Sequence, residues 1–228
     1  MRTPLTSIRA FTEILSDDHG AVSEEERRNF MGIIAKESER LTRLIDQILD
    51  LAKMEAGQLD WSMERISLHG AVDEALASVN GLIKEKSIRL DLEIPPRLPM
   101  IRADRDRLVQ VVINLLSNAV KFCRDPDGLI QVRAAPVADG LLVSIADNGD
   151  GVLPEDRDRV FEKFHQINHS SPTQPVGTGL GLAICRQIVT FFGGDIWVDT
   201  REGGGASFSF TLPYDQVEEV MGQGRVAN

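Results

Sequence analysis

Asn114-Leu-Leu-Ser-Asn118, Asp147-Asn-Gly-Asp-Gly151 and Gly177-Thr-Gly-Leu-Gly-Leu182 are the three stretches that decide the fold of this 228-residue chain. Their amide oxygens suit a hydrated Mg²⁺ and phosphate groups. A carboxylate can accept a hydrogen bond from the edge of a base, and glycine backbone can pass close to a triphosphate. The combination predicts a site for ATP.

Other glycine-rich phosphate and metal sites do not fit the spacing of these motifs. No stretch reads G-x-x-x-x-G-K-[ST], which excludes a P-loop. A dinucleotide fingerprint would need a third glycine three residues after Gly179, where the chain has Leu182. An EF-hand beginning at Asp147 would need glycine at its sixth position, where the chain has Val152.

Two further segments extend the pattern, one from Asp104 to Phe122 and the other Phe161-Glu-Lys-Phe164. With these boxes in this order, the chain resembles the ATP-binding domain shared by sensor histidine kinases, type II topoisomerases, mismatch-repair ATPases and the large heat-shock chaperone ATPases. The two segments resemble the asparagine and phenylalanine boxes of the kinase branch. The resemblance implies the core of a two-component sensor histidine kinase, which uses ATP and Mg²⁺ to phosphorylate a histidine and relays the group to an aspartate on a response regulator.

Asn114 and Asn118 are four residues apart on a predicted helix and therefore share a face, which could also be an ordinary solvated face. The resemblance makes Asn118 the Mg²⁺ ligand and gives Asn114 a role in holding the phosphates. Lys121 lies on nearly the same face and offers an ammonium group to a phosphate, although lysines at such positions are commonly just exposed. Phe122 completes the box and is included among the ATP-binding residues.

Asp147 follows an apolar segment that reads as a strand, so its carboxylate is expected at the rim of a sheet. The resemblance implies that it accepts the adenine amino hydrogen, although D-N-G-D-G alone is more often a surface turn. Gly149 and Gly151 would let the chain turn closely past the base. The remaining predicted binding residues form a lid over the triphosphate: Gly177, Thr178, Gly179, Leu180, Gly181 and Leu182.

The phenylalanine box is predicted to be a short helix, on which Phe161 and Phe164 are core residues that steady the lid. Phe164 is also counted among the binding residues. Kinases of this kind often place an arginine after the box, whereas this chain has His165. That phosphate contact is therefore in question, with Lys163 as a weak substitute.

Composition limits the class of protein. Hydrophobic residues make up 42% and charged residues 26% of the chain, as in an ordinary globular protein. The net charge of −10 argues against a nucleic-acid partner, because phosphate backbones bind basic surfaces. Cys123 and Cys185 show no metal or disulfide spacing, and no apolar run is long enough to span a membrane. We expect a cytoplasmic core whose parent reaches the inner membrane only through segments outside this sequence.

The first 58 residues predict a hairpin of two antiparallel helices. One helix covers residues 5–16, and the second is opened by the capping-box pair Ser23 and Glu26 and runs to about Ala56. A helix of that length forms a rod of about 50 Å, too long for the first helix to cover. A second copy of the hairpin would complete a dimeric four-helix bundle, which makes a homodimer the preferred interpretation over packing against its own chain.

Residues 59–213 predict an α/β sandwich, so the fold class is α+β, and residues 214–228 are expected to be a tail. Predicted helices cover residues 72–83, 105–123, 154–164 and 178–192. Predicted strands cover residues 88–94, 129–135, 141–146, 195–200 and 206–212.

The resemblance also implies an acceptor histidine three positions before Arg2, in a segment reading roughly H-E-L-R-T-P-L. None of the four histidines present has this context. We expect this chain to bind ATP without phosphorylating itself. Thr3 matches the threonine used in the family's phosphatase reaction on the response regulator. A kinase-like scaffold or phosphotransfer adaptor without autophosphorylation is the alternative function, and the topoisomerase or chaperone branch is a weaker third.

Overall fold

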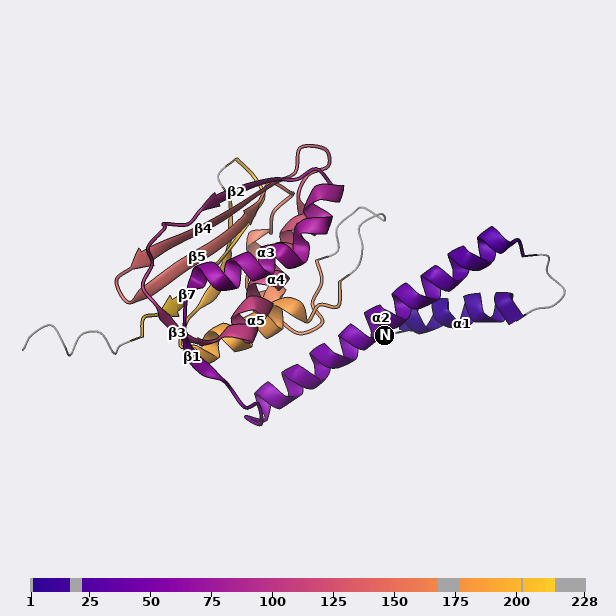
Figure 1. The fold of residues 1–228 in the computed structure, drawn as a ribbon, viewed down its shortest axis with the longest axis horizontal. Coiled ribbons are helices and arrows are strands. Elements are labelled where there is room, and N and C mark those ends of the chain that lie inside the picture. The colour runs from indigo at the N-terminus through magenta and orange to yellow at the C-terminus, as the bar shows by residue number, and fades with distance from the viewer. Residues whose placement is uncertain (1, 17–21, 168–176, 202, 216–228) are drawn as a thin grey trace, which may run out of the picture. The chain divides into compact units, whose positions relative to one another are not determined.

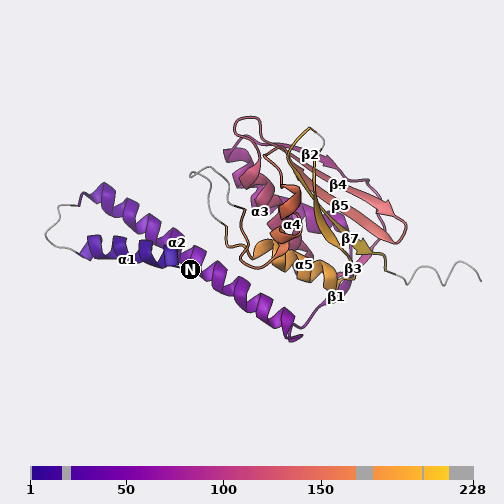
Figure 2. The ribbon, with the colours of Figure 1, turned by 180° about the vertical axis from the view of Figure 1, so that it is seen from behind.

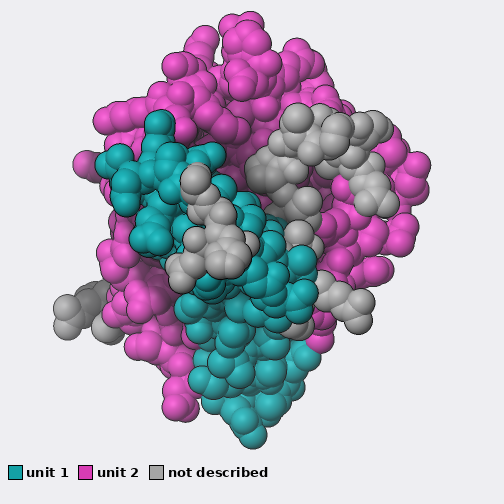
Figure 3. Space-filling view, turned by 90° about the vertical axis from the view of Figure 1, so that its right-hand side faces the viewer, with its two compact units in different colours: residues 1–59 teal, residues 60–228 magenta. Residues whose placement is uncertain are grey.

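The computed structural model describes residues 2–16, 22–167, 177–201 and 203–215. The chain divides into two compact units, Met1–Leu59 and Asp60–Asn228 (Figure 3). The first unit is helical, and the second combines helices with β-sheets. The predicted order of a helical hairpin followed by an α/β sandwich is therefore confirmed. Among the described residues, no helix combines the length and apolar character needed to cross a bilayer.

The first unit is a hairpin of α1 (Arg2–Ser16) and α2 (Glu24–Glu55). The predicted capping box is present: Ser23 Oγ accepts the Glu26 N–H at 3.2 Å, and Glu26 Oε2 accepts the Ser23 N–H at 2.9 Å. Phe11 of α1 stacks on Phe30 of α2 with ring centroids 5.1 Å apart. The predicted break after α1 falls largely on residues 17–21, outside the described part of the chain.

The second unit is built on a five-stranded sheet in the order β2-β4-β5-β7-β6. Strand β2 pairs parallel to β4, and the other neighbours are antiparallel. Helices α3, α4 and α5 cover one face of this sheet (Figures 1 and 2). The bounds are α3 Leu68–Glu85, β2 Arg89–Glu93, α4 Arg105–Phe122, β4 Leu129–Val137, β5 Gly140–Asp147, α5 Gly181–Phe191, β6 Ile196–Thr200 and β7 Ala206–Pro213.

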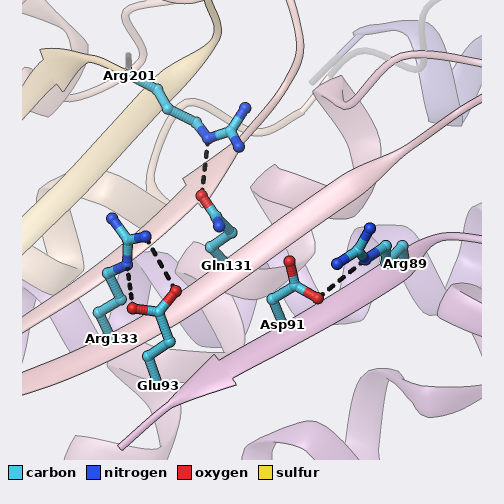
Figure 4. A network of polar contacts seen from close by, with 6 residues as sticks. All are labelled: Arg89, Asp91, Glu93, Gln131, Arg133 and Arg201. Carbon is cyan, nitrogen blue, oxygen red and sulfur yellow. Dashed lines mark hydrogen bonds and ion pairs between the residues drawn. The ribbon is translucent and has the colours of Figure 1, made fainter. Parts of the chain in front are cut away.

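Alternation along the strands separates an apolar face from a polar one. Along β4, Ile130 and Val132 are fully buried. Their neighbours are not, since Gln131 is half-buried and Arg133 is exposed. Arg133 makes two hydrogen bonds of 2.9 Å to Glu93 of β2 (Figure 4). The same close-up shows Arg201 bonded to Gln131 at 3.0 Å. One face of the sheet thus meets the helices and the other carries polar side chains, as in a two-layer sandwich.

Two short strands were not predicted from the sequence. β1 (Met63–Ile66) pairs antiparallel with β3 (Ile101–Asp104) in a separate two-stranded sheet. Each has only four residues, too few to show a clear period of two. Tyr214 bridges to Ile101 and Asp215 pairs with Arg65 at 2.9 Å, so contacts of this unit extend to Asp215. The rest of the predicted tail, residues 216–228, lies outside the described residues.

Two helix predictions were wrong in part. The segment 154–164 forms two separate 3-10 turns, Pro154–Asp156 and Arg159–Phe161, in place of one helix. Helix α5 begins at Gly181, three residues after the predicted start, because Gly179 has φ of +71°, which a helix cannot contain. The difference matters for the site, because it leaves residues 177–180 as a loop.

Candidate nucleotide site

Helix α4 presents the predicted amide and ammonium side chains on one side. Asn114, Asn118 and Lys121 are all half-buried. Asn114 donates from Nδ2 to the Gly181 carbonyl oxygen at 3.4 Å, at the first turn of α5. Lys121 Nζ lies 3.7 Å from the position that a Cβ would take on Gly177. The fold therefore brings this face of α4 beside both ends of the glycine-rich segment.

Asp147 ends strand β5 and is buried, with 3% of its surface exposed. Its Oδ1 accepts the N–H groups of Gly149 at 2.8 Å and Ala206 at 3.4 Å. Burial raises the pKa of the Asp147 carboxyl, and the charge of Asp150 adds to this, while the two backbone N–H groups and Arg201 act to lower it. Oδ1 thus has two donors, both from backbone, and its position is fixed by the chain.

The loop after Asp147 packs directly on the end of α4. A Cβ on Gly149 would collide with the carbonyl oxygen of Phe122, so only glycine allows this approach. Gly151 follows with φ of +81°. The segment Asp147–Gly151 and the last turn of α4 are consequently in contact, although 25 residues separate Phe122 from Asp147 in the sequence.

The glycine-rich segment runs from an exposed Gly177 to a fully buried Leu180. Leu180 donates its N–H to Thr178 Oγ1 at 3.3 Å, and Gln166 Nε2 donates to the Gly177 carbonyl oxygen at 3.0 Å. Helix α5 then begins at Gly181, and Leu182 is half-buried in its first turn. Leu180 anchors this end of the glycine-rich segment in the core. Residues 168–176 of the predicted polar loop lie outside the described part of the chain.

The phenylalanine box contacts the lid in a different way from the one predicted. Phe161 is buried and packs edge-on against Phe208, with ring centroids 6.2 Å apart. Phe164 is 57% exposed and has φ of +61°, so its prediction as a helical core residue was wrong. Its backbone N–H instead donates to the Gly179 carbonyl oxygen at 2.8 Å. The helical spacing failed because the chain leaves the 3-10 turn at Phe161.

His165 stands where related kinases often have arginine, and it faces an acidic side chain. Its Nε2 lies 3.7 Å from Asp156 Oδ1, and both side chains are largely buried. Lys163 is exposed. The backbone of His165 is close to the glycine-rich segment, because a Cβ on Gly179 would come within 3.0 Å of the His165 carbonyl oxygen.

Asn148 is a structural residue that sequence reasoning missed. Its Oδ1 accepts the N–H groups of Arg124 at 3.2 Å and Leu129 at 3.0 Å, and its Nδ2 donates to the Asp127 carbonyl oxygen at 2.7 Å. It therefore fixes the loop between α4 and β4 to the segment Asp147–Gly151. Asparagine followed by glycine indicates a turn. The sequence could not indicate that Asn148 bonds to backbone groups of residues 124–129, which are about 20 positions earlier.

Thr3, the remaining predicted residue, lies in the first turn of α1 in the other unit. Its side chain is outside the described part of the structure. The other fourteen predicted residues belong to α4, to the end of β5 and its following loop, and to the segment from Phe164 to Leu182.

Comparisons with known proteins match both units. Residues 103–216 match the family described as histidine kinase-, DNA gyrase B- and HSP90-like ATPases, and residues 1–57 match the His Kinase A phospho-acceptor domain. The second unit is therefore an ATPase domain of this class, joined to a phospho-acceptor hairpin. The chain belongs to the sensor histidine kinase family and comprises its catalytic core.

Individual relatives agree with this assignment. The sensor histidine kinase WalK of Bacillus subtilis is 31% identical over 223 residues, which cover 96% of this chain and 36% of WalK. The crystal structure of full-length ShkA in complex with AMPPNP has a TM-score of 0.72 and 29% identity, covering 93% of this chain and 43% of ShkA. A structure of histidine kinase ThkA in complex with the response regulator TrrA has a TM-score of 0.68 and 26% identity, covering 93% of this chain and 58% of that one. The chain spans about a third of the length of WalK.

Proposed function

We propose that the second unit binds Mg-ATP between α4, the end of β5 and the glycine-rich segment, for phosphorylation of a histidine and relay to a response-regulator aspartate. The observation that carries the proposal is the meeting of three sequence-distant motifs: Asn114 contacts Gly181, and Gly149 packs on the end of α4. The family supports ATP as the substrate, as does AMPPNP, an ATP analogue, in the related ShkA structure. ATP and receiver domains are found in the cytoplasm, which is where this proposal places the core.

Asp147 is the residue proposed to select adenine. Since its Oδ1 already accepts two backbone N–H groups, Oδ2 is the oxygen proposed to accept the adenine amino hydrogen. The same two bonds hold the carboxylate in place before the base arrives, which reduces the entropy lost on binding. A side chain at Gly149 or Gly151 would collide with the carbonyl oxygen of Phe122 or Gly205, so backbone lines this part of the proposed base site, and Phe122 is proposed to border it from α4.

The phosphate side would be formed by backbone and by α4. The N–H groups of Gly177, Gly179 and Gly181 and the N-terminus of α5 offer partial positive charge. Lys121 adds a full charge beside Gly177, and Asn114 holds the first turn of α5. These groups supply a local positive field in a chain of net charge −10. Thr178, Gly179, Leu180 and Leu182 set the shape of the lid, and Phe164 holds Gly179 through its backbone.

Mg²⁺ fits this donor set. Among the described residues, no three His, Cys, Asp or Glu side chains gather closely enough to hold a metal ion by themselves. Mg²⁺ in phosphoryl-transfer sites is commonly bound by phosphates, water and one or two protein oxygens, and here the Asn118 amide would be the protein ligand. When bound, the ion neutralises charge on the phosphates. Asn118 would orient it, and Lys121 would share the neutralisation.

The hairpin supports the remaining part of the proposal. Five large apolar side chains are exposed on it, with exposed fractions of 42% to 60%: Leu5, Ile14, Met31, Ile45 and Leu49. We infer that a second copy covers them in a homodimeric four-helix bundle. A response-regulator receiver domain is the proposed partner of this bundle, and the complex of the related kinase ThkA with the response regulator TrrA supports a partner of this class. Thr3 is the proposed phosphatase residue, positioned near the start of α1.

The nucleotide assignment is tested by titrating the chain with a fluorescent ATP analogue in the presence of Mg²⁺. Asp147→Asn keeps the size of the side chain but removes its charge, and we expect affinity to fall by about tenfold or more, the effect of losing a hydrogen bond to a charged group. Asp139→Asn is the matched control, because Asp139 is exposed just before the opposite end of β5. Equal affinity of the parent and Asp147→Asn would remove the adenine role.

The same titration tests the metal ligand. Chelating Mg²⁺ should weaken binding to the parent chain, and the dependence on Mg²⁺ concentration should shift to higher concentrations in Asn118→Ala. Ser117→Ala, one residue earlier on α4, should behave as the parent. An unchanged Mg²⁺ dependence in Asn118→Ala would contradict the assignment of Asn118.

A further inference from the structure

The chain enters the sheet domain at a point that is held by three contacts, two of Trp61 and one of Ser62. Trp61 stacks on Phe191 with ring centroids 3.7 Å apart and planes inclined by 9°, and it meets Phe192 edge-on at 5.8 Å. The next residue, Ser62, donates its backbone N–H to Asp104 Oδ2 at 3.0 Å. These five residues all belong to the unit Asp60–Asn228 and are called the entry anchor below.

Each contact of the entry anchor lies at the end of a helix that carries candidate nucleotide residues. Phe191 is the last residue of α5, whose first residue is Gly181 of the lid. Asp104 is the N-cap of α4, and its Oδ1 accepts the Arg107 N–H at 3.1 Å. Helix α5 has eleven residues and spans about 16 Å. A displacement of Phe191 is therefore transmitted to Gly181 through one stiff helix.

The two helices are also joined to each other near the site. Asn114 of α4 donates a hydrogen bond to the Gly181 carbonyl oxygen at 3.4 Å. The Cys185 thiol of α5 donates a hydrogen bond to the Val111 carbonyl oxygen of α4 at 3.8 Å. Burial raises the pKa of the Cys185 thiol to about 12, so the thiol remains protonated and available as a donor. Because of these links, α4 and α5 respond to the entry anchor together.

The position of Trp61 in the chain gives the entry anchor its significance. Helix α2 ends at Glu55, and the division between the two units falls after Leu59. Both cysteines are free and lie in the second unit, so the peptide chain itself is the covalent connection between the hairpin and the sheet domain. A change of conformation carried by that connection reaches Trp61 and Ser62 first.

We propose that Trp61 is a positioning residue for the nucleotide site. Together with Ser62 it couples the connection from the hairpin to the lid through Phe191, and to helix α4, which carries Asn114 and Asn118, through Asp104. The inference rests on the proposed function, because it concerns the same site. Coupling between two sites is reciprocal in binding free energy. Nucleotide binding must therefore alter the surroundings of Trp61, and disturbing the Trp61 stack must weaken nucleotide binding.

Intrinsic fluorescence tests the first consequence, because the chain has only two tryptophans. In Trp197→Phe the only emission comes from Trp61, and we expect its intensity or wavelength to change when Mg-AMPPNP is added. In Trp61→Phe the emission comes from Trp197 on β6, which makes none of the contacts of the entry anchor, and should stay constant. A constant Trp61 signal at saturating nucleotide would overturn the coupling.

Affinity for a fluorescent ATP analogue tests the second consequence, at a temperature where circular dichroism shows every variant folded. Trp61→Ala should bind about fivefold more weakly, Trp61→Phe should recover most of the affinity, and Trp197→Phe should match the parent. Phe191→Ala should have the effect of Trp61→Ala, with no further loss in the double variant, because both remove one contact.

The outcomes separate the two proposals. If Trp61→Ala binds as the parent does while Asp147→Asn still weakens binding, the coupling is refuted and the nucleotide site stands. If the folded parent does not bind the analogue at all, the proposed function itself fails. Loss of thermal stability in Trp61→Ala with unchanged affinity would assign Trp61 a purely structural role.

Discussion

In the hairpin, Leu5, Ile14, Met31, Ile45 and Leu49 are exposed by 42% to 60%, whereas the sheet domain encloses side chains as large as Phe210 and Leu108 completely. The two regions differ in what covers their apolar residues. In the domain, helices and sheet cover each other, so its core is complete within one chain. In the hairpin, a short α1 faces a 32-residue α2. Much of the apolar stripe on α2 therefore has no cover from α1, and a partner surface is needed.

The largest expected effect is in the sheet domain. Phe210 lies on β7, an interior strand between β5 and β6, with none of its surface exposed, so Phe210→Ala should lower the unfolding free energy by about 4 kcal/mol through lost burial and the cavity left behind. In a calorimetric scan the midpoint temperature of the domain's unfolding transition should fall by roughly 10 °C. Leu153→Ala, at a position that is 58% exposed, is the control and should change it little. An equal effect of the two variants would contradict a self-contained core.

A smaller effect is expected in the hairpin, and it should appear in association. Met31, Ile45 and Leu49 recur on one side of α2, since spacings of 14 and 4 residues return to nearly the same direction. Leu49→Asp places a charge on this side and should raise the dimer dissociation constant by about 30-fold, the effect of losing roughly 2 kcal/mol. Sedimentation measures it.

Asn29→Asp is the matched control for that experiment. It adds the same charge to α2 at an exposed position outside the apolar stripe, so the dissociation constant should remain that of the parent. A monomeric parent chain, or equal dissociation constants for the two variants, would refute the inference that a second copy of the hairpin covers the apolar stripe of α2.

The smallest effect is a pH dependence that should have opposite signs in the two regions. The pKa of Glu26 in the hairpin is lowered by its hydrogen bonds from Ser23, so its stabilisation is present above its ordinary value of 4.5 and is lost as pH falls through the folded pKa. The pKa of Asp147 is raised, chiefly by burial. Its contribution is present below the ordinary value of 3.8 and is lost as pH rises through the folded pKa.

Denaturation of each region between about pH 3 and 6 checks this contrast. Relative to Glu26→Gln, the hairpin of the parent should gain stability as pH rises. Relative to Asp147→Asn, the sheet domain of the parent should lose stability as pH rises. Parallel curves for the parent and either variant would contradict the corresponding pKa shift.

The elements that the sequence predicted well have local signals. The Ser23 and Glu26 pair marked the start of α2, and the apolar run from Leu141 to Ala146 marked β5, which the structure extends by one residue at each end. The failures depended on distant contacts. Strands β1 and β3 are stabilised by each other and by Tyr214, and each is too short to carry a pattern. Phe164 left its predicted helix because its N–H bonds to Gly179, fifteen residues away.

The sequence alone determined the kind of chemistry. Amide, carboxylate and glycine residues in a fixed order and spacing predict a nucleotide site, because each side chain and each glycine carries its chemical property wherever the chain places it. Only the tertiary structure decided how that site is assembled. It placed two backbone N–H groups on Asp147 Oδ1, packed Gly149 on the end of α4, and stacked Trp61 at the far end of α5. Such contacts join residues up to 130 positions apart, and packing of the whole domain selects them.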